Sequence, residues 1–170
     1  QAVQRVVAEG LAQPILVGRP PVIAEKIESM ALGLRPGIDF EIIDYLDDDL
    51  MTRMGVEYHN MMMRRGVTPK AAQARIRANF TLVASMALRM GMGDAMVCGT
   101  FGSYTKHLDV VRDVIGKRAG VDDLSALSVL LLPKGTFFLT DTHVTYEPTA
   151  EQITESVILA SEEMRLFGIQ

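Results

Sequence analysis

The residues best suited to ligand chemistry in this 170-residue chain lie in the segment Cys98–Ser103. The segment follows the apolar run Ala95–Cys98, which has the length of a strand, and precedes a helical pattern. Glycine there lets the backbone approach a ligand, and free N–H groups at the helix start can bind a phosphate or a carbonyl oxygen. Gly99, Thr100 and Ser103 are therefore candidate ligand-binding residues. A tight strand-to-helix turn without a ligand has the same pattern, and this alternative stays open.

Charged residues supply further candidates. Arg64 and Arg65, with Arg75 and Arg77 beyond them, carry the guanidinium groups that bind phosphates, although such charges are also typical of a solvated helix face. Asp141 ends an apolar run, where a carboxylate can either contact a ligand or cap a turn. The sequence leaves both alternatives open for each group.

The sequence gives little support for a metal site or for a nucleophilic cysteine. His59, His107 and His143 are far apart and lack the short spacing of a helical metal motif, so no metal site is predicted. Cys98 ends an apolar run and is predicted to be a small buried side chain, not a nucleophile. The run Asp47–Asp49 lacks the glycine and distal glutamate of a calcium loop and is predicted to start a helix.

Composition limits the classes of partner. A net charge of −4 gives no electrostatic footprint for nucleic acid, and no apolar run approaches the ~18 residues of a membrane span. One cysteine excludes an internal disulfide and fits a reducing cytoplasm. Three consecutive methionines, Met61–Met63, cannot all face one core, so part of this run is predicted to meet a partner.

The positioning elements are predicted to be α/β. Strand-length apolar runs at Ile15–Gly18, Phe40–Asp44 and Ala95–Cys98 alternate with helical stretches, which favours a largely parallel sheet covered on both faces. Ala126–Leu132 and Thr136–Thr140 flank a Pro-Lys-Gly loop and predict an antiparallel hairpin. The sheet is therefore expected to be mixed.

Helix signals are clear in three places. A helix is expected over Val22–Leu32, ended by Gly33, and the stretch from Asp48 to Gly91 is expected to be helical, with Thr68-Pro69 as a cap inside it. Thr149 and Gln152 have the spacing of a capping box. An apolar stripe and a glycine stop follow that box: Ala150, Ile153, Val157, Ala160, Met164, Phe167 and Gly168.

The segment Asp141–Glu155 resembles the phosphate acetyl/butyryltransferase family. In that family an acidic strand end runs through a Pro-Thr-Ala-Glu tetrad, here Pro148–Glu151, into a long helix. The resemblance covers nearly the whole chain and is strongest to the C-terminal phosphotransacetylase-like domain of bacterial hybrid NADP-dependent malic enzymes. Four other segments follow in the family's order: Glu9–Pro20, Arg35–Asp44, Met61–Ala72 and Gly91–Leu108.

The resemblance implies a fold. It implies a three-layer α/β/α architecture with a mostly parallel, mixed sheet, phosphotransacetylase-like and similar to isocitrate and isopropylmalate dehydrogenases. Residues 1–170 would be a partial domain truncated at both ends, because the chain opens inside an amphipathic helix and stops where relatives continue. The sequence does not locate the boundary between sub-domains.

The resemblance also implies a site with altered chemistry. Gly99 and Ser103 align with the loop that lines the acyl-phosphate and coenzyme A cleft of phosphotransacetylases. Active members carry an arginine shortly after this loop, but here Leu108 is followed by Asp109. A carboxylate repels phosphate where a guanidinium would neutralise it, so retained binding with lost transfer chemistry is expected.

The resemblance therefore favours an acetyl-CoA-responsive regulatory and oligomerisation domain that is not itself catalytic and holds no cofactor. Its cytoplasmic parent would decarboxylate malate oxidatively to pyruvate, with NADP and a divalent Mg or Mn ion in an upstream half. Gly99, Thr100, Ser103, Arg64, Arg65 and Asp141 would line the acetyl-CoA cleft. A homodimer or larger assembly is expected, and the alternative is a fragment of an active phosphate acyltransferase.

Overall fold

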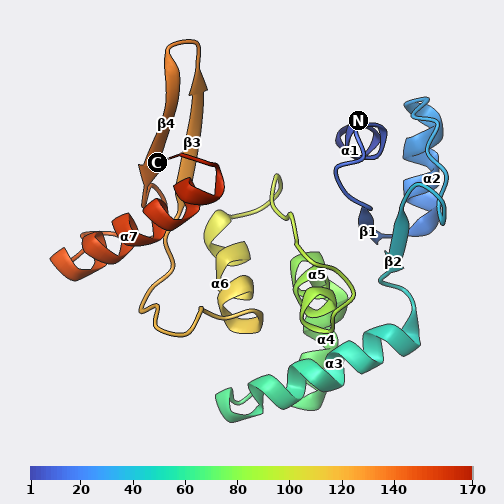
Figure 1. Ribbon diagram of the computed structural model, residues 1–170. Helices are drawn as coiled ribbons and strands as arrows, with labels where there is room; N and C mark the ends of the chain where they lie inside the picture. The colour runs from blue at the N-terminus through green and yellow to red at the C-terminus, as the bar shows by residue number, and fades with distance from the viewer. Residues whose placement is uncertain (170) are drawn as a thin grey trace. The chain divides into compact units, whose positions relative to one another are not determined.

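The computed structural model describes residues 1–169 of the chain (Figure 1). The backbone forms two compact units, Gln1–Ile115 and Gly116–Gln170. Among the described residues, no helix is long and apolar enough to cross a lipid bilayer. The two units contain different kinds of sheet, one parallel and one antiparallel.

The first unit begins with a β-α-β crossover. Helix α1 (Ala2–Ala8) precedes strand β1 (Ile15–Gly18), which pairs in parallel with β2 (Glu41–Asp44) in the register Ile15↔Glu41 to Gly18↔Asp44. Helix α2 (Pro20–Ser29) makes the long connection that parallel strands require. Both predicted strands are confirmed, the second beginning one residue later than expected.

The predicted helix Val22–Leu32 has different bounds. It begins two residues earlier, because proline is well tolerated in the first turn, where its missing N–H has no intrahelical partner. It also ends earlier, at Ser29, and Gly33 lies beyond the helix with a φ of +67°. Gly33 therefore belongs to the turn after α2 and does not cap it.

The middle of the first unit is helical, which confirms the prediction for Asp48 to Gly91. Its elements are α3 (Asp48–Met62), the 3-10 turn η1 (Met63–Arg65), α4 (Pro69–Ala78) and α5 (Phe80–Arg89), and α6 (Tyr104–Val114) follows. The Asp47 carboxylate accepts a hydrogen bond from the Leu50 N–H at 3.0 Å, so the aspartate run is a helix start as predicted. The Thr68 hydroxyl caps α4 through the Ala71 N–H at 3.2 Å.

Methionine fills much of the core of this unit. Met51, Met54 and Met86 are fully buried, and this flexible side chain fits irregular spaces between helices. The consecutive methionines separate as predicted: Met62 is 5% exposed, whereas Met63 is 54% exposed. A partner contact for the exposed member stays a prediction.

The expected strand Ala95–Cys98 is wrong. These residues have no strand pairing among residues 1–169, Val97 is fully exposed, and Cys98 is exposed instead of buried. An extended run becomes a strand only when a neighbouring backbone satisfies its N–H and C=O groups. This segment instead runs as irregular chain between α5 and α6.

The second unit is a hairpin with one helix. Strands β3 (Leu127–Leu132) and β4 (Gly135–Thr140) pair antiparallel through a Pro-Lys turn, which confirms the predicted hairpin. Helix α7 (Ala150–Leu166) contacts β4, and the Phe138 and Phe167 rings meet edge to face with centroids 5.8 Å apart. The unit thus has one helix layer against a two-stranded ribbon.

Helix α7 has the predicted capping box but only part of the predicted buried stripe. The Thr149 hydroxyl accepts from the Gln152 N–H, while the Gln152 side chain accepts from the Thr149 N–H. Ile153 and Val157 are 51% and 53% exposed, so they do not face the core of this unit. The helix buries Ala160, which belongs to the predicted stripe, together with Ser156, which does not. The Ser156 hydroxyl lies 2.6 Å from the Ser125 hydroxyl, so the buried side of α7 includes a polar contact with the segment before β3.

The chain is therefore an α/β protein with parallel and antiparallel strand pairs. Each sheet has two strands among the described residues, and the three-layer arrangement stays a prediction.

The methionine run offers a matched test of core packing. Replacing Met62 by Ala removes a buried side chain and is expected to lower the free energy of unfolding by about 2–4 kcal/mol. Met63→Ala, at the next residue but exposed, is expected to change it by less than about 0.5 kcal/mol. Urea denaturation of both variants measures the difference. Equal losses would contradict the assignment of Met62 to the core.

Candidate functional site

The first unit contains a cavity of about 620 Å³, within the size range of small-molecule sites. Most of its wall comes from strand β1, helix α5 and the segment from Met92 to His107, and Ile43 of β2 and the end of α4 complete it. Gly99 and Ser103, both predicted from the sequence, lie in this wall. The cavity places them against the apolar side chains of Ile15 and Val17 from β1.

The loop before α6 has an unusual backbone. Gly99 and Gly102 have φ angles of +124° and +96°, which L-residues with a side chain rarely adopt. Thr100 has a φ of +63°, which is uncommon for a β-branched residue, and strained residues of this kind cluster at functional sites. The Thr100 hydroxyl donates to the Gly99 carbonyl oxygen at 2.7 Å. The loop is therefore shaped by its glycines and by one strained threonine.

The loop ends at the start of α6. Ser103 is the N-cap residue, but its side chain makes no cap hydrogen bond to any described residue, and its hydroxyl lies 2.7 Å from that of Thr105. The first N–H groups of a helix are donors with no partner inside the helix, and the helix dipole favours negative charge there. With Lys106 also in the cavity wall, this corner suits an anionic or carbonyl oxygen.

His107 is a site residue that the sequence did not reveal. Its Nε2 lies 2.8 Å from the Phe101 carbonyl oxygen, and its Nδ1 lies 2.7 Å from the Thr81 hydroxyl. A carbonyl oxygen only accepts, so Nε2 carries the hydrogen; in the neutral ring Nδ1 then accepts from the threonine. The imidazole therefore ties the loop to α5, where Thr81 is buried.

In the sequence, His107 suggested only a metal ligand, without a second histidine at helical spacing. The usable signal was its position four residues after Ser103, which puts both on one face of α6. The loop packs closely on this ring, because a Cβ added at Gly102 would lie 3.3 Å from Nε2.

The two arginines lie elsewhere in the first unit. The Arg65 guanidinium pairs with the Asp113 carboxylate at 2.5 Å, in the last turn of α6. At 1.5 Å per residue, Asp113 is about 15 Å along the helix from Ser103. Arg64 is exposed, and neither arginine is among the described residues that line the cavity. Their ligand-binding role stays a prediction without a place in this cavity.

Asp141 lies in the second unit and has the capping role that the sequence left open. Its carboxylate accepts from the N–H groups of Ala126 at 3.3 Å and Thr145 at 3.0 Å. Partial burial alone would raise the pKa of Asp141, but hydrogen bonds from the Thr145 side chain and from backbone N–H groups outweigh it and hold the pKa below its usual value. The carboxylate therefore stays ionised and fastens the turn after β4.

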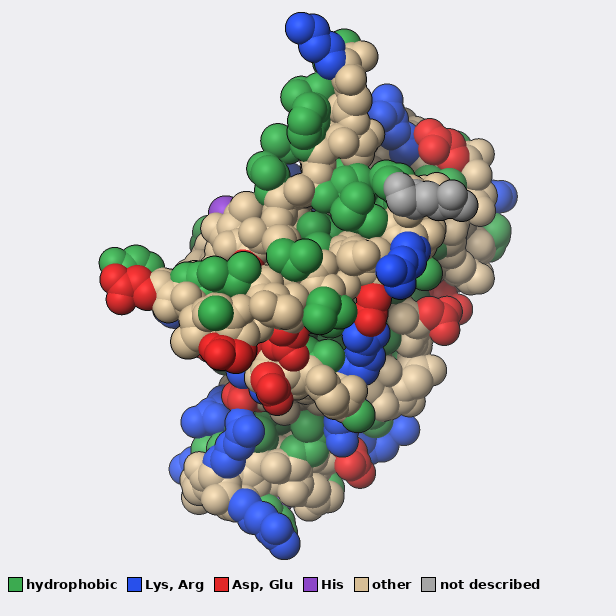
Figure 2. Space-filling model, turned by 60° about the vertical axis from the view of Figure 1, so that its left-hand side comes forward, with side chains coloured by type: hydrophobic (Ala, Val, Ile, Leu, Met, Phe, Trp, Pro, Cys, Tyr) green, Lys and Arg blue, Asp and Glu red, His purple; other side chains and the backbone are tan. Residues whose placement is uncertain are grey.

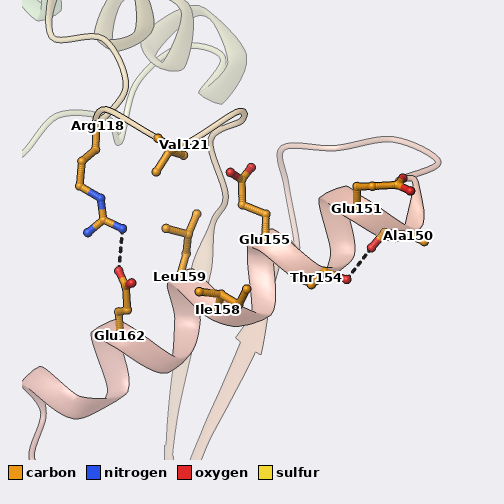
Figure 3. Close-up of a pocket in the computed structure, with 10 residues that line it drawn as sticks. Arg118, Val121, Ala150, Glu151, Thr154, Glu155, Ile158, Leu159 and Glu162 are labelled. Atoms are coloured by element: carbon orange, nitrogen blue, oxygen red, sulfur yellow. Dashed lines mark hydrogen bonds and ion pairs between the residues drawn. The ribbon is translucent and has the colours of Figure 1, made fainter.

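A second hollow of about 490 Å³ lies along α7 in the second unit (Figure 3). The Arg118 guanidinium and the Glu162 carboxylate pair across it at 2.6 Å. The Glu155 carboxylate accepts from the N–H groups of Asp122 and Asp123 at 2.7 and 2.9 Å. Its charged groups thus already pair within the unit, which makes this hollow the weaker candidate site.

Residues 1–170 match the protein-family model described as phosphate acetyl/butaryl transferase. The chain belongs to the phosphate acetyl/butyryltransferase family. It is 47% identical to an NADP-dependent malic enzyme of Haemophilus influenzae and 40% identical to an NAD-dependent malic enzyme of Rhizobium meliloti. Each match covers 99% of this chain and 22% of the relative, so the chain spans about a fifth of these enzymes.

More distant members carry the name of the transferase itself. A phosphate acetyltransferase of Clostridium acetobutylicum is 25% identical, over 96% of this chain and 50% of that protein. The structure of the EutD phosphotransacetylase from Staphylococcus aureus superposes with a TM-score of 0.84 at 16% identity, covering 99% of this chain and 49% of that one. The fold is therefore phosphotransacetylase-like, as the sequence resemblance predicted.

The two hydrogen bonds of the His107 imidazole, to Phe101 and Thr81, are predicted to slow local opening of the loop. His107→Leu removes both hydrogen bonds and is expected to speed amide hydrogen exchange at Phe101–Ser103 about tenfold, since the two bonds together contribute about 1.4 kcal/mol. His59→Leu is the control, because that ring bonds the Val67 carbonyl oxygen at 2.9 Å elsewhere in the same unit. Unchanged exchange in the His107 variant would show that the bridge does not hold the loop.

Proposed function

We propose that this chain is the acetyl-CoA-responsive regulatory and oligomer-forming domain of a cytoplasmic malic enzyme. The parent would decarboxylate malate oxidatively to pyruvate, using NADP and Mg or Mn in a catalytic part outside these residues. The carrying observation is the match at 47% identity to a malic enzyme, over 99% of this chain. The chain itself would be a binding module without a catalytic residue.

The cavity supports this proposal by its chemistry. An acetyl thioester has a small apolar group beside a carbonyl oxygen, and the wall offers Ile15 and Val17 near the N–H groups that begin α6. Gly99 allows the backbone to approach the ligand closely, and Lys106 supplies a positive charge for a phosphate. Binding of this kind needs neither a metal nor a nucleophile.

The residue after Leu108 argues against acyl transfer to phosphate. Asp109 lies on α6 with its side chain 65% exposed, and it pairs with Arg112 at 3.3 Å. A carboxylate at this position repels an anionic acyl acceptor. The second candidate function, an active phosphate acyltransferase, is favoured by the match to phosphate acetyltransferases at 25% identity.

Acetyl-CoA binding is testable by calorimetry on the full-length protein. The wild type is expected to bind acetyl-CoA, and Gly99→Ala to weaken binding about tenfold, because a side chain at that φ strains the loop by about 1–3 kcal/mol. Gly33→Ala is the matched control, since Gly33 also has positive φ and open space around it but lies outside the cavity wall. No heat from the wild type at millimolar acetyl-CoA would refute the proposal.

Asp109 stands where active members of the family carry an arginine, and this difference predicts that transfer of the acetyl group to phosphate is lost. The full-length protein is expected to form no acetyl phosphate from acetyl-CoA and phosphate, whereas Asp109→Arg is expected to gain measurable turnover if this charge alone blocks the reaction. Asp109→Asn removes the repulsion without adding a guanidinium and separates the two effects. Ordinary phosphotransacetylase turnover in the wild type would favour the second candidate instead.

A further inference from the structure

Helix α5 buries two hydroxyl groups, those of Thr81 and Ser85, one turn apart. Polar side chains are ordinary at the surface, and acidic, basic and hydrophobic groups are mixed on the face of the molecule that Figure 2 shows. In the core, a hydroxyl costs free energy unless it makes a hydrogen bond, and a valine would fill the place of a threonine without that cost. The partners of the two hydroxyls therefore show what each of them does.

Ser85 has its partner within its own helix. Its hydroxyl donates to the Thr81 carbonyl oxygen at 2.8 Å, the usual bond of a helical serine to the residue four positions earlier. A hydroxyl has a single hydrogen, so the Met96 sulfur, at 3.5 Å from the same oxygen, is a secondary contact. Ser85 is thus satisfied inside α5.

Thr81 has its partner on another helix. It is the second residue of α5, so the helix offers it no carbonyl oxygen one turn earlier. Its hydroxyl lies 2.7 Å from Nδ1 of His107, and Nε2 of the same ring donates to the Phe101 carbonyl oxygen at 2.8 Å. These two hydrogen bonds, called the relay below, join the core, the ring and the loop in series.

The relay ends on the peptide group between Phe101 and Gly102. This group is planar and trans, so the Gly102 N–H points in the direction opposite to the Phe101 carbonyl oxygen. When the His107 ring holds that oxygen, it also sets the direction of the N–H. Gly102 lies in the cavity wall, and glycine has too much backbone freedom to keep one orientation unaided. The direction of a donor in the cavity wall therefore depends on the relay.

We propose that Thr81 is a positioning residue for the ligand of this cavity. It acts through His107, by holding the ring that orients the Phe101–Gly102 peptide. The Gly102 N–H is then preset for an acceptor on the ligand, such as a thioester carbonyl oxygen or a phosphate oxygen. The proposal rests on the acetyl-CoA binding of the proposed function and adds the core residue that prepares the loop for it.

A hydroxyl serves this place in both charge states of the ring. When the imidazole is neutral, the Thr81 hydroxyl donates to Nδ1; when the ring is protonated, Nδ1 donates and the hydroxyl oxygen accepts. Nε2 carries a hydrogen in both states, so the bond to Phe101 persists. A serine at position 81 would keep the relay in either state, whereas a valine of the same shape would break it.

Hydrogen exchange on the full-length protein without ligand tests the relay. Thr81→Val is expected to speed exchange at Gly102 about three- to tenfold, because one or both hydrogen bonds of the ring are lost. Thr81→Ser is expected to return the rate to that of the wild type. Ser85→Ala is the matched control, since it removes the other buried hydroxyl of α5 and leaves the ring in place. Equal rates in wild type and Thr81→Val would overturn the proposal.

Calorimetry with acetyl-CoA tests the effect on the ligand. Thr81→Val is expected to bind about three- to tenfold more weakly than the wild type, and Thr81→Ser within about twofold of it. Because Thr81 also borders the cavity, a double variant separates action through the ring from direct contact. Adding Thr81→Val to His107→Leu is expected to weaken binding no further. A second loss in the double variant would show direct contact and overturn the role through His107.

The two measurements separate the positioning role from the proposed function. If the wild type and Thr81→Val bind acetyl-CoA equally tightly, the positioning role is wrong and the proposed function stands. If the wild type gives no binding heat, the proposed function and the ligand step are both refuted, and the exchange rates still confirm or overturn the relay. Thermal unfolding of Thr81→Val and Ser85→Ala shows that both variants stay folded.

Discussion

The burial of helix α5 is the constraint on which the first unit depends, because α3, α4, α6 and β1 all pack against it. Six of its ten residues are buried, which leaves little freedom in its orientation. Two of the buried residues, Thr81 and Ser85, are polar, and both have hydrogen-bond partners. One of those bonds connects α5 to α6, because the Thr81 hydroxyl contacts the His107 ring.

This contact connects the packing of the core to the geometry of the candidate site. The loop Gly99–Ser103 has no strand ladder to hold it, and its positive φ angles cost free energy that the surroundings must offset. The imidazole of His107 provides part of that support by donating to the Phe101 carbonyl oxygen. A loop held by one side chain can keep an open backbone for a ligand while the helices behind it stay rigid.

Family membership and local chemistry point in different directions at one position. The family is named for acyl transfer with phosphate, and the fold is that of a phosphotransacetylase. Yet Asp109 is a carboxylate where the resemblance implies an arginine, and it pairs with Arg112 on its own helix without being among the described residues that line the cavity. A fold can keep a binding cavity while the chemistry changes at one residue, because function depends on the site and not on the architecture.

Local signals were sufficient for much of this protein. The caps at Asp47, Thr68 and Thr149 and the hairpin around Pro133-Lys134 follow from interactions between residues a few positions apart, so the sequence by itself determined them. The family and its loop, with Gly99 and Ser103, were also recognisable in the sequence.

Only the tertiary structure decided what distant residues do. Ala95–Cys98 looked like a strand, but a strand requires a partner that local sequence does not specify. The stripe on α7 looked like a core face, yet of its residues Ile153 and Val157 are half-exposed, and the buried side of the helix consists of Ala160 and the polar Ser156. His107 carried no motif, and its role depends on Thr81, which is 26 residues away in the chain. Pairing, burial and hydrogen bonds between distant segments depend on how the elements pack, and no short stretch of sequence contains that information.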